Sequence, residues 1–175
     1  MIHWQMDRDE QTWMNEGLSN LAMLLNGYST GGSEQNYLAN PDLQLNHWPE
    51  ITPDRSAHYG ASFLFFSYFL DHFGEQATKA LIAHPDNGLD SMDRVLADQG
   101  IQAPGSGQTL GADDVFRDWV VASYLQDEAI EDGRYDYRSL SDLLKPAPAE
   151  SISACPTGQI PAQVNQYGVD YIQIR

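Results

Sequence analysis

The sequence predicts a mainly α-helical fold of about five helices, with a long loop over residues 26–55 and an extended C-terminal segment that carries a short strand. Three observations support this: apolar residues recur at helical spacing in several stretches, Gly or Pro follows the end of most of them, and a β-branched and aromatic run closes the chain. With 175 residues, of which 42% are hydrophobic, the chain can fold as one domain around its own core. We expect residues 1–145 to form a helical subdomain. Residues 146–175 would form a Pro-rich connector and the extended segment of the same domain.

The first helix is expected from about Asp9 to Leu25. Its apolar residues fall at i, i+4, i+7 and i+11, which makes one helical stripe: Met14, Leu18, Leu21 and Leu25. The 26–55 loop that follows is rich in Gly, Ser, Asn and Pro. Its ring-bearing side chains either anchor the loop to the core or line a cleft: Tyr28, Tyr37, His47 and Trp48.

The second helix is expected from Ser56 to Phe73. It is apolar nearly all round, which is typical of a central, buried helix. Gly74 should end it, and a third helix should run over 75–84. A turn with a short helix is expected within 86–100, and the last helix over 112–125. The final run, 164–175, predicts one strand whose partner the sequence does not identify.

The charge of the chain excludes several classes of partner. Twenty-five Asp and Glu stand against nine Lys and Arg, a net charge of −16, and such a surface repels nucleic acid and anionic lipid. The longest apolar run, around residues 63–66, is too short to span a bilayer, so no membrane insertion is expected. The lone Cys155 excludes an internal disulfide, and no signal peptide is visible in the chain.

The stretch WMNEGLSNLA, residues 13–22, resembles the segment that supplies the third zinc ligand in gluzincin metallopeptidases, the thermolysin-like and hyicolysin-like group. In that family two His come from H-E-x-x-H on one helix and a Glu comes from the next helix. The resemblance implies that Glu16 is the zinc-binding carboxylate and that Asn15 is the Asn preceding it. Asn20 stands where the family usually has an acidic residue that supports a His ligand through a hydrogen bond. From spacing alone, Glu16 is an ordinary carboxylate at the border of the buried helix face.

A second stretch, SAHYGASFLFFSYFLDHFG, resembles the helix that walls the active site opposite the zinc in these peptidases. There a His or Tyr at the head of the helix donates a hydrogen bond to the oxyanion of the tetrahedral intermediate. The resemblance implies this role for Tyr59, or else for His58. The alternative is that both residues form only a polar helix entry.

The chain contains no H-E-x-x-H, because none of its five His has a His partner four residues away. The opening residues Met1–Trp4 resemble the continuation that directly follows the second His of that motif. We therefore expect Met1 to be an internal methionine and the chain to be the C-terminal part of a zinc peptidase catalytic domain. Zinc would belong to the full-length protein, and this chain alone is predicted neither to hold zinc tightly nor to cleave peptides. The alternative is a non-catalytic helical binding or scaffold module derived from a peptidase.

The expected partner is a peptide or protein substrate, and an exposed half-site could also lead the chain to self-associate. By family resemblance the location is extracellular or at the cell surface. A separate acidic cluster precedes Gly133 and could in principle bind calcium through its oxygens: Asp127, Glu128, Glu131 and Asp132. It lacks EF-hand spacing, so we expect a solvated surface and no calcium.

Overall fold

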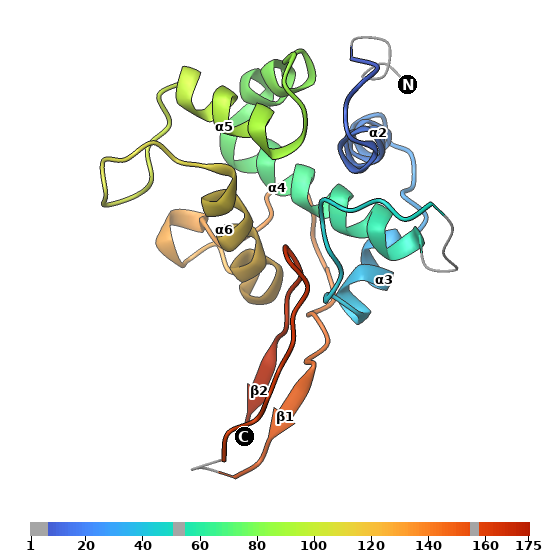
Figure 1. Ribbon diagram of the computed structural model, residues 1–175, viewed down its shortest axis with the longest axis vertical. Coiled ribbons are helices and arrows are strands. Elements are labelled where there is room, and N and C mark those ends of the chain that lie inside the picture. Colours follow the sequence, from blue (N-terminus) through green and yellow to red (C-terminus); the bar gives the residue numbers. More distant parts are fainter. Residues whose placement is uncertain (1–6, 51–54, 155–157) are drawn as a thin grey trace.

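The computed structural model describes residues 7–50, 55–154 and 158–175. Over these residues the fold is mainly α-helical, as the sequence predicts. The helices are α2 (Thr12–Leu25), α3 (Ser33–Ala39), α4 (Arg55–Ile82), α5 (Gly88–Asp98) and α6 (Ala112–Leu125), with a 3-10 turn η1 (Glu131–Gly133). Figure 1 shows the helices gathered into one body, from which two short strands project as an arm. Among the described residues, no helix combines the length and the apolar character that crossing a membrane requires.

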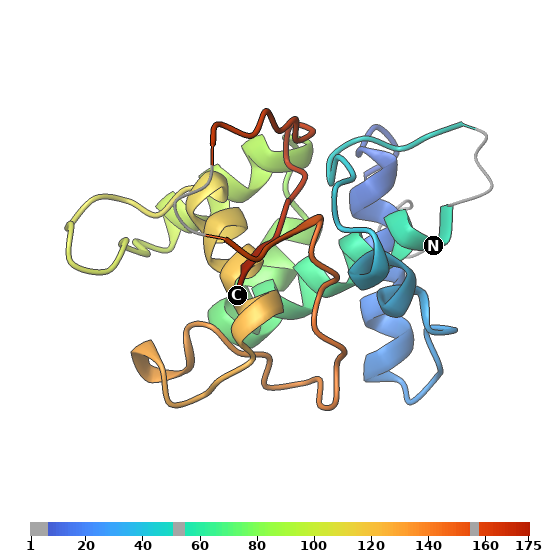
Figure 2. The same cartoon turned by 90° about the horizontal axis from the view of Figure 1, so that it is seen from below.

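Helix α4 is the centre of the core, as its uniformly apolar sequence predicts. Residues 60–69 are buried without interruption. The ring of Trp13 from α2 stacks on Phe66 at 5.4 Å, and the ring of Trp119 from α6 meets Phe65 edge-on at 5.4 Å. Figure 2 shows α4 between α2 on one side and α6 on the other. Aromatic packing from both sides therefore fixes the position of α4.

The predicted break at Gly74 is present. The backbone of Gly74 has φ 78° and ψ 176°, which lies outside the helical region and which a residue with a side chain adopts only with strain. Helical structure resumes at once and continues to Ile82. The second and third predicted helices are thus two arms of α4 that join at this glycine.

The predicted stripe of the first helix is only partly buried. Met14, Leu18 and Leu21 lie in the core, whereas Leu25 is 63% exposed. The last turn of α2 extends past the core, and periodicity alone does not show where a helix leaves its neighbours.

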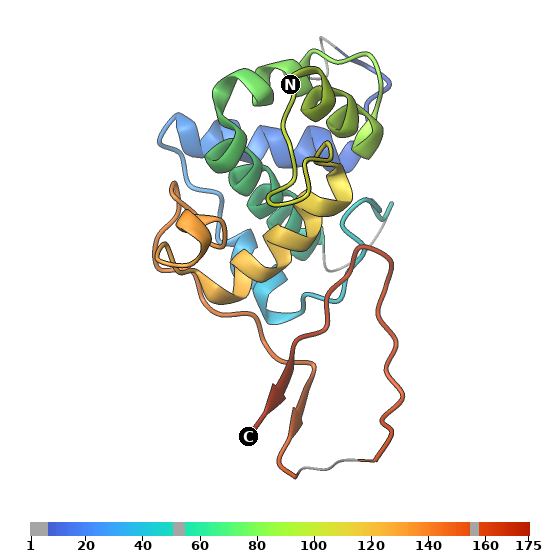
Figure 3. The ribbon, with the colours of Figure 1, turned by 90° about the vertical axis from the view of Figure 1, so that its left-hand side faces the viewer.

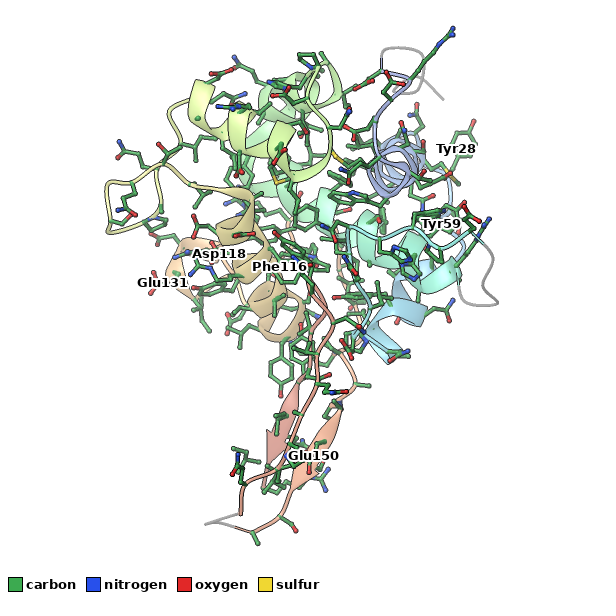
Figure 4. All side chains as sticks on the ribbon, viewed as in Figure 1. Tyr28, Tyr59, Phe116, Asp118, Glu131 and Glu150 are labelled. Atoms are coloured by element: carbon green, nitrogen blue, oxygen red, sulfur yellow. The ribbon has the colours of Figure 1, made fainter. Side chains whose placement is uncertain are left out.

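The 26–55 loop contains a helix that the sequence analysis missed. Helix α3 has seven residues, too few for a clear periodic pattern. Its Tyr37 is 2% exposed and stacks on Trp119 at 5.5 Å, so this aromatic residue anchors the segment to the core. Tyr28, by contrast, is exposed (Figure 4).

The C-terminal strand has a partner. Strand β2 (Ile172–Ile174) pairs in parallel with β1 (Glu150–Ile152), with Glu150 opposite Ile172. Sequence analysis assigned the region of β1 to an irregular Pro-rich connector, because three residues, E-S-I, carry no recognisable alternation. Figure 3 shows that the chain leaves β1, returns to the helical body and comes back to β2.

Candidate functional site

Glu16 lies where α2 crosses α4 at close range. The next residue, Gly17, packs directly on α4: a Cβ there would lie 2.6 Å from Cδ2 of Phe66 and 2.7 Å from Cβ of Ser62. Only a glycine allows the two helices to approach this closely. The half-buried Glu16 is thereby brought to the head of α4.

The phenol of Tyr59, near the head of α4, lies close enough to Glu16 to respond to its charge. Burial raises the pKa of the Tyr59 phenol above its ordinary value of 10.0, and the negative charge of Glu16 and a hydrogen bond to its carboxylate raise it further. Arg55 acts in the opposite direction. The phenol therefore stays protonated at neutral pH and can donate a hydrogen bond. Figure 4 shows Tyr59 at the end of α4 that lies beside α2.

Of the two candidates at the head of α4, Tyr59 has a pKa that the charge of Glu16 raises. His58 is half-buried, and its ring lies 6.1 Å from that of Trp48 in an edge-on arrangement. Trp48 also meets Tyr59, at 4.9 Å and 88° between ring planes. The structure thus brings together Glu16, Tyr59, His58 and Trp48 from two helices and the segment before α4.

The two asparagines flank Glu16 on α2, and both are half-buried. The amide nitrogen of Asn15 donates to the backbone carbonyl of Glu10 at 3.2 Å, which ties the start of the helix together. Asn20 lies one turn beyond Glu16, so it shares the helix face of the carboxylate.

The described residues do not form a complete metal site around Glu16. No group of three or more His, Cys, Asp or Glu side chains within residues 7–50, 55–154 and 158–175 is placed to hold a metal ion. A catalytic zinc takes three protein ligands. Glu16 alone therefore does not fit zinc, and the Met1–Trp4 stretch lies outside the described residues. The acidic cluster around η1 is exposed; within it, the carboxylate of Asp127 accepts a hydrogen bond from the backbone N–H of Ala129 at 2.9 Å.

A cavity of about 1090 Å³ opens elsewhere, at the N-terminal ends of α5 and α6. Carboxylates line this cavity, and two of them form hydrogen bonds within the fold. Asp93 accepts from the backbone N–H of Ala112 at 2.7 Å, and Asp113 accepts from the hydroxyl of Tyr167 at 2.6 Å. These bonds fix the start of α6 and the C-terminal segment, so we assign no ligand to this cavity.

Sequence analysis did not single out Trp48 as a site residue. It left open whether the aromatic residues of the 26–55 loop anchor the loop or line a cleft. No local signal separates the two, because the contact of Trp48 with Tyr59 depends on tertiary packing.

Comparison with known proteins adds no assignment: no protein-family model matches the chain, and no curated protein matches it significantly.

Proposed function

We propose that this chain is the helical, C-terminal half of the catalytic domain of a zinc-dependent peptidase. The observation that carries the proposal is the close approach of α2 to α4 at Gly17, which brings Glu16 near enough to Tyr59 for its charge to raise the Tyr59 pKa. The family resemblance assigns the metal-binding carboxylate to Glu16 and the oxyanion donor to Tyr59. In such a site both groups must serve the same reacting centre, and here the crossing of α2 and α4 brings them near each other.

The proposed reaction is the hydrolysis of a peptide bond. Attack of water on the carbonyl carbon places negative charge on the carbonyl oxygen, and Tyr59 would donate a hydrogen bond to that oxygen. Its raised pKa keeps the proton on the phenol at neutral pH. A substrate oxygen that gains charge would compete with Glu16 for this donor. Removal of one such donor typically lowers kcat by about 10²–10³-fold.

The other two ligands and the general base would come from residues other than those described. The first test is the nucleotide sequence upstream of the Met1 codon. An in-frame His-Glu-x-x-His that ends directly before Met1 supports the proposal. A stop codon with a ribosome-binding site would reject it and leave a helical module.

The second test uses the protein expressed from its whole reading frame. Glu16→Gln should remove zinc, measured by metal analysis, and abolish peptide hydrolysis, with a thermal stability close to that of the metal-free wild type. Glu75→Gln, which changes an exposed carboxylate on α4, is the matched control and should change neither. Tyr59→Phe should keep the zinc and lose turnover. Retention of zinc by Glu16→Gln would contradict the assignment.

The 175-residue chain alone should contain no stoichiometric zinc and cleave no peptide. A stoichiometric zinc site in the purified chain would overturn this prediction. The lack of a three-ligand group among the described residues is also the observation that favours the alternative, a non-catalytic helical module. In that case Glu16→Gln should change no activity or binding of the protein.

A further inference from the structure

The outer edge of β2 has no partner strand among the described residues. On the inner side of β2, the N–H of Arg175 donates to the carbonyl of Ile152 in β1 at 2.9 Å. The backbone groups of successive residues point to opposite edges of a strand, so those of Ile172 and Ile174 point away from β1. The sheet has two strands in the described part of the chain, and Figure 3 shows no helix or strand on the other side of β2. The outer N–H and C=O groups of β2 are therefore open to a further strand.

This edge is both apolar and exposed to solvent. The side chains of Ile172 and Ile174 are 50% and 67% exposed. Parallel sheets in folded proteins are normally covered on both faces, and an isolated pair of strands is at best marginally stable in water. An exposed, unpaired strand edge is a template on which an extended peptide can add as a further strand. The arm therefore has the properties of a docking edge.

A groove beside β2 continues this edge onto the helical body. It has a volume of about 570 Å³ and lies between the end of α6, the connector before β1 and β2 itself. The rings of Tyr124 and Tyr171 stack at 5.5 Å in its wall, and Pro146 and Pro148 also line it. The hydroxyl of Tyr171 donates to the carbonyl of Val120 at 2.7 Å, which fixes this wall to α6. Because the wall is already ordered, binding of an extended segment costs little further entropy there.

The charge of the groove is opposite to that of the whole chain. Its lining includes Lys145 and Arg175 but no Asp or Glu, although the chain carries 25 acidic and nine basic residues. The ammonium of Lys145 donates to the carbonyls of Tyr124 and Leu125 at 2.7 and 2.6 Å. The guanidinium of Arg175 donates to the side-chain oxygen of Gln173 at 3.0 Å. No ion pair joins either cation to another described residue, so carboxylates are the complementary partners of this groove.

We propose that the outer edge of β2 binds an extended acidic segment of another protein, which adds to the sheet as a third strand. The backbone of this segment bonds to Ile172 and Ile174, and its carboxylates lie near Lys145 and Arg175. A second copy of this chain fits less well, because its own β2 edge carries the same two cations and like charges would meet. The inference goes beyond the peptidase proposal and does not depend on it, since no residue of the candidate site lines this groove.

The test uses the 175-residue chain, labelled with nitrogen-15 for NMR, and two probe octapeptides. One probe alternates Val and Glu, and the matched probe alternates Val and Lys. The salt concentration is about 0.15 M, where screening limits the effect of the distant negative charges of the chain. The Val-Glu peptide should shift the amide signals of Ile172 and Ile174 in a saturable titration. The Val-Lys peptide should bind about fivefold more weakly, or less tightly still.

Three variants separate backbone pairing from charge. Ile174→Pro removes an N–H at the open edge and should weaken binding of the Val-Glu peptide by about tenfold. Ile174→Ala keeps that N–H and, as the matched control, should weaken binding much less. Arg175→Gln should weaken binding of the Val-Glu peptide by about 2–5-fold and leave that of the Val-Lys peptide no weaker. Nuclear Overhauser contacts between β1 and β2 verify that each variant keeps the strand pair.

Four results would each overturn the inference. The first is the absence of a saturable shift at Ile172 and Ile174, and the second is equal or tighter binding of the Val-Lys peptide. The third is an equal loss of binding in Ile174→Pro and Ile174→Ala, since the backbone of β2 would then not be the binding group. The fourth is a dimer of the peptide-free chain in sedimentation equilibrium that Ile174→Pro dissociates, because the edge would then belong to a second copy.

Discussion

Replacement of Gly17 by alanine tests whether close helix packing, and not helix propensity, explains the glycine next to Glu16. In an unconstrained helix, Gly→Ala stabilises by about 0.8–1 kcal/mol, because alanine loses less backbone entropy on folding. At Gly17, however, the new Cβ would lie 2.6 Å from the ring of Phe66 and 2.7 Å from Cβ of Ser62. Ordinary carbon contacts are about 3.5–4.0 Å. The methyl group therefore overlaps both neighbours.

Neither neighbour can move easily. The Cβ of Ser62 is fixed to the backbone of α4, and the Phe66 ring is stacked on Trp13 at 5.4 Å. Overpacking of a rigid core typically costs about 1–3 kcal/mol, and this site belongs to the upper part of that range. After subtraction of the propensity gain, Gly17→Ala should lower the free energy of unfolding by about 1–2 kcal/mol.

Urea unfolding followed by circular dichroism measures this quantity from the midpoint and slope. Ala22→Gly, at an exposed position of the same helix, is the matched control and should cost about 1 kcal/mol from propensity alone. The reasoning is refuted if Gly17→Ala stabilises the protein by about as much as Ala22→Gly destabilises it. That outcome would mean that the methyl group finds room and that Gly17 is not needed for the crossing.

Three further predictions concern the rest of the fold. Arg134→Ala should lower the free energy of unfolding by about 1–3 kcal/mol, because it removes the two hydrogen bonds of 2.7 and 2.8 Å to the largely buried Asp118 (labelled in Figure 4). The free energy of unfolding of Arg134→Lys should lie between those of the wild type and Arg134→Ala. A loss under about 0.5 kcal/mol in Arg134→Ala would show that solvent screens the ion pair. Burial lowers the pKa of His72 below its ordinary value of 6.5. As pH falls, the unfolded chain therefore takes up a proton at His72 before the folded chain does. The contribution of neutral His72 to the free energy of unfolding is thus present above pH 6.5 and is lost as pH falls. The stability difference between wild type and His72→Gln should therefore shrink from about pH 7.5 to about pH 5 in urea titrations, and a constant difference would contradict a neutral, half-buried His72. Gly60→Ala should lower the free energy of unfolding by about 3 kcal/mol, because its Cβ would overlap the backbone carbonyl of Ser33, which cannot rotate away. Thermal and urea unfolding measure this loss, which should exceed that of Gly17→Ala; a loss no larger than that of Gly17→Ala would contradict the prediction.

Local sequence signals predicted the features of the fold that depend on neighbouring residues. The apolar run of α4 predicted a buried central helix, and Gly74 predicted the break in it. Helix α6 begins and ends where its pattern indicates. Such features follow from hydrophobic periodicity and from the backbone preferences of Gly and Pro, both of which can be read directly from neighbouring residues in the sequence.

Features that depend on distant contacts were missed. Strand β1 forms because β2, which comes later in the chain, pairs with it. The three residues E-S-I contain no signal that predicts this pairing. Helix α3 is too short to show a period, and Tyr37 holds it on Trp119 across the core. In the candidate site, a resemblance suggested Glu16 and Tyr59 separately. Their proximity, and the contact of Tyr59 with Trp48, required the tertiary structure.

The parallel pairing of β1 and β2 has a consequence for the order in which the chain folds. Parallel strands cannot be joined by a tight turn, and here the connection runs back to the helical body before β2 begins (Figure 3). Docking of the turn at 165–168 on residues 42–45 shortens the free connection and so lowers the entropic cost of pairing, while the pair itself buries little apolar surface. We expect the backbone amides of β1 and β2 to lose protection in hydrogen exchange well before those of α4. The arm should thus be the last part of the chain to fold and the first to open.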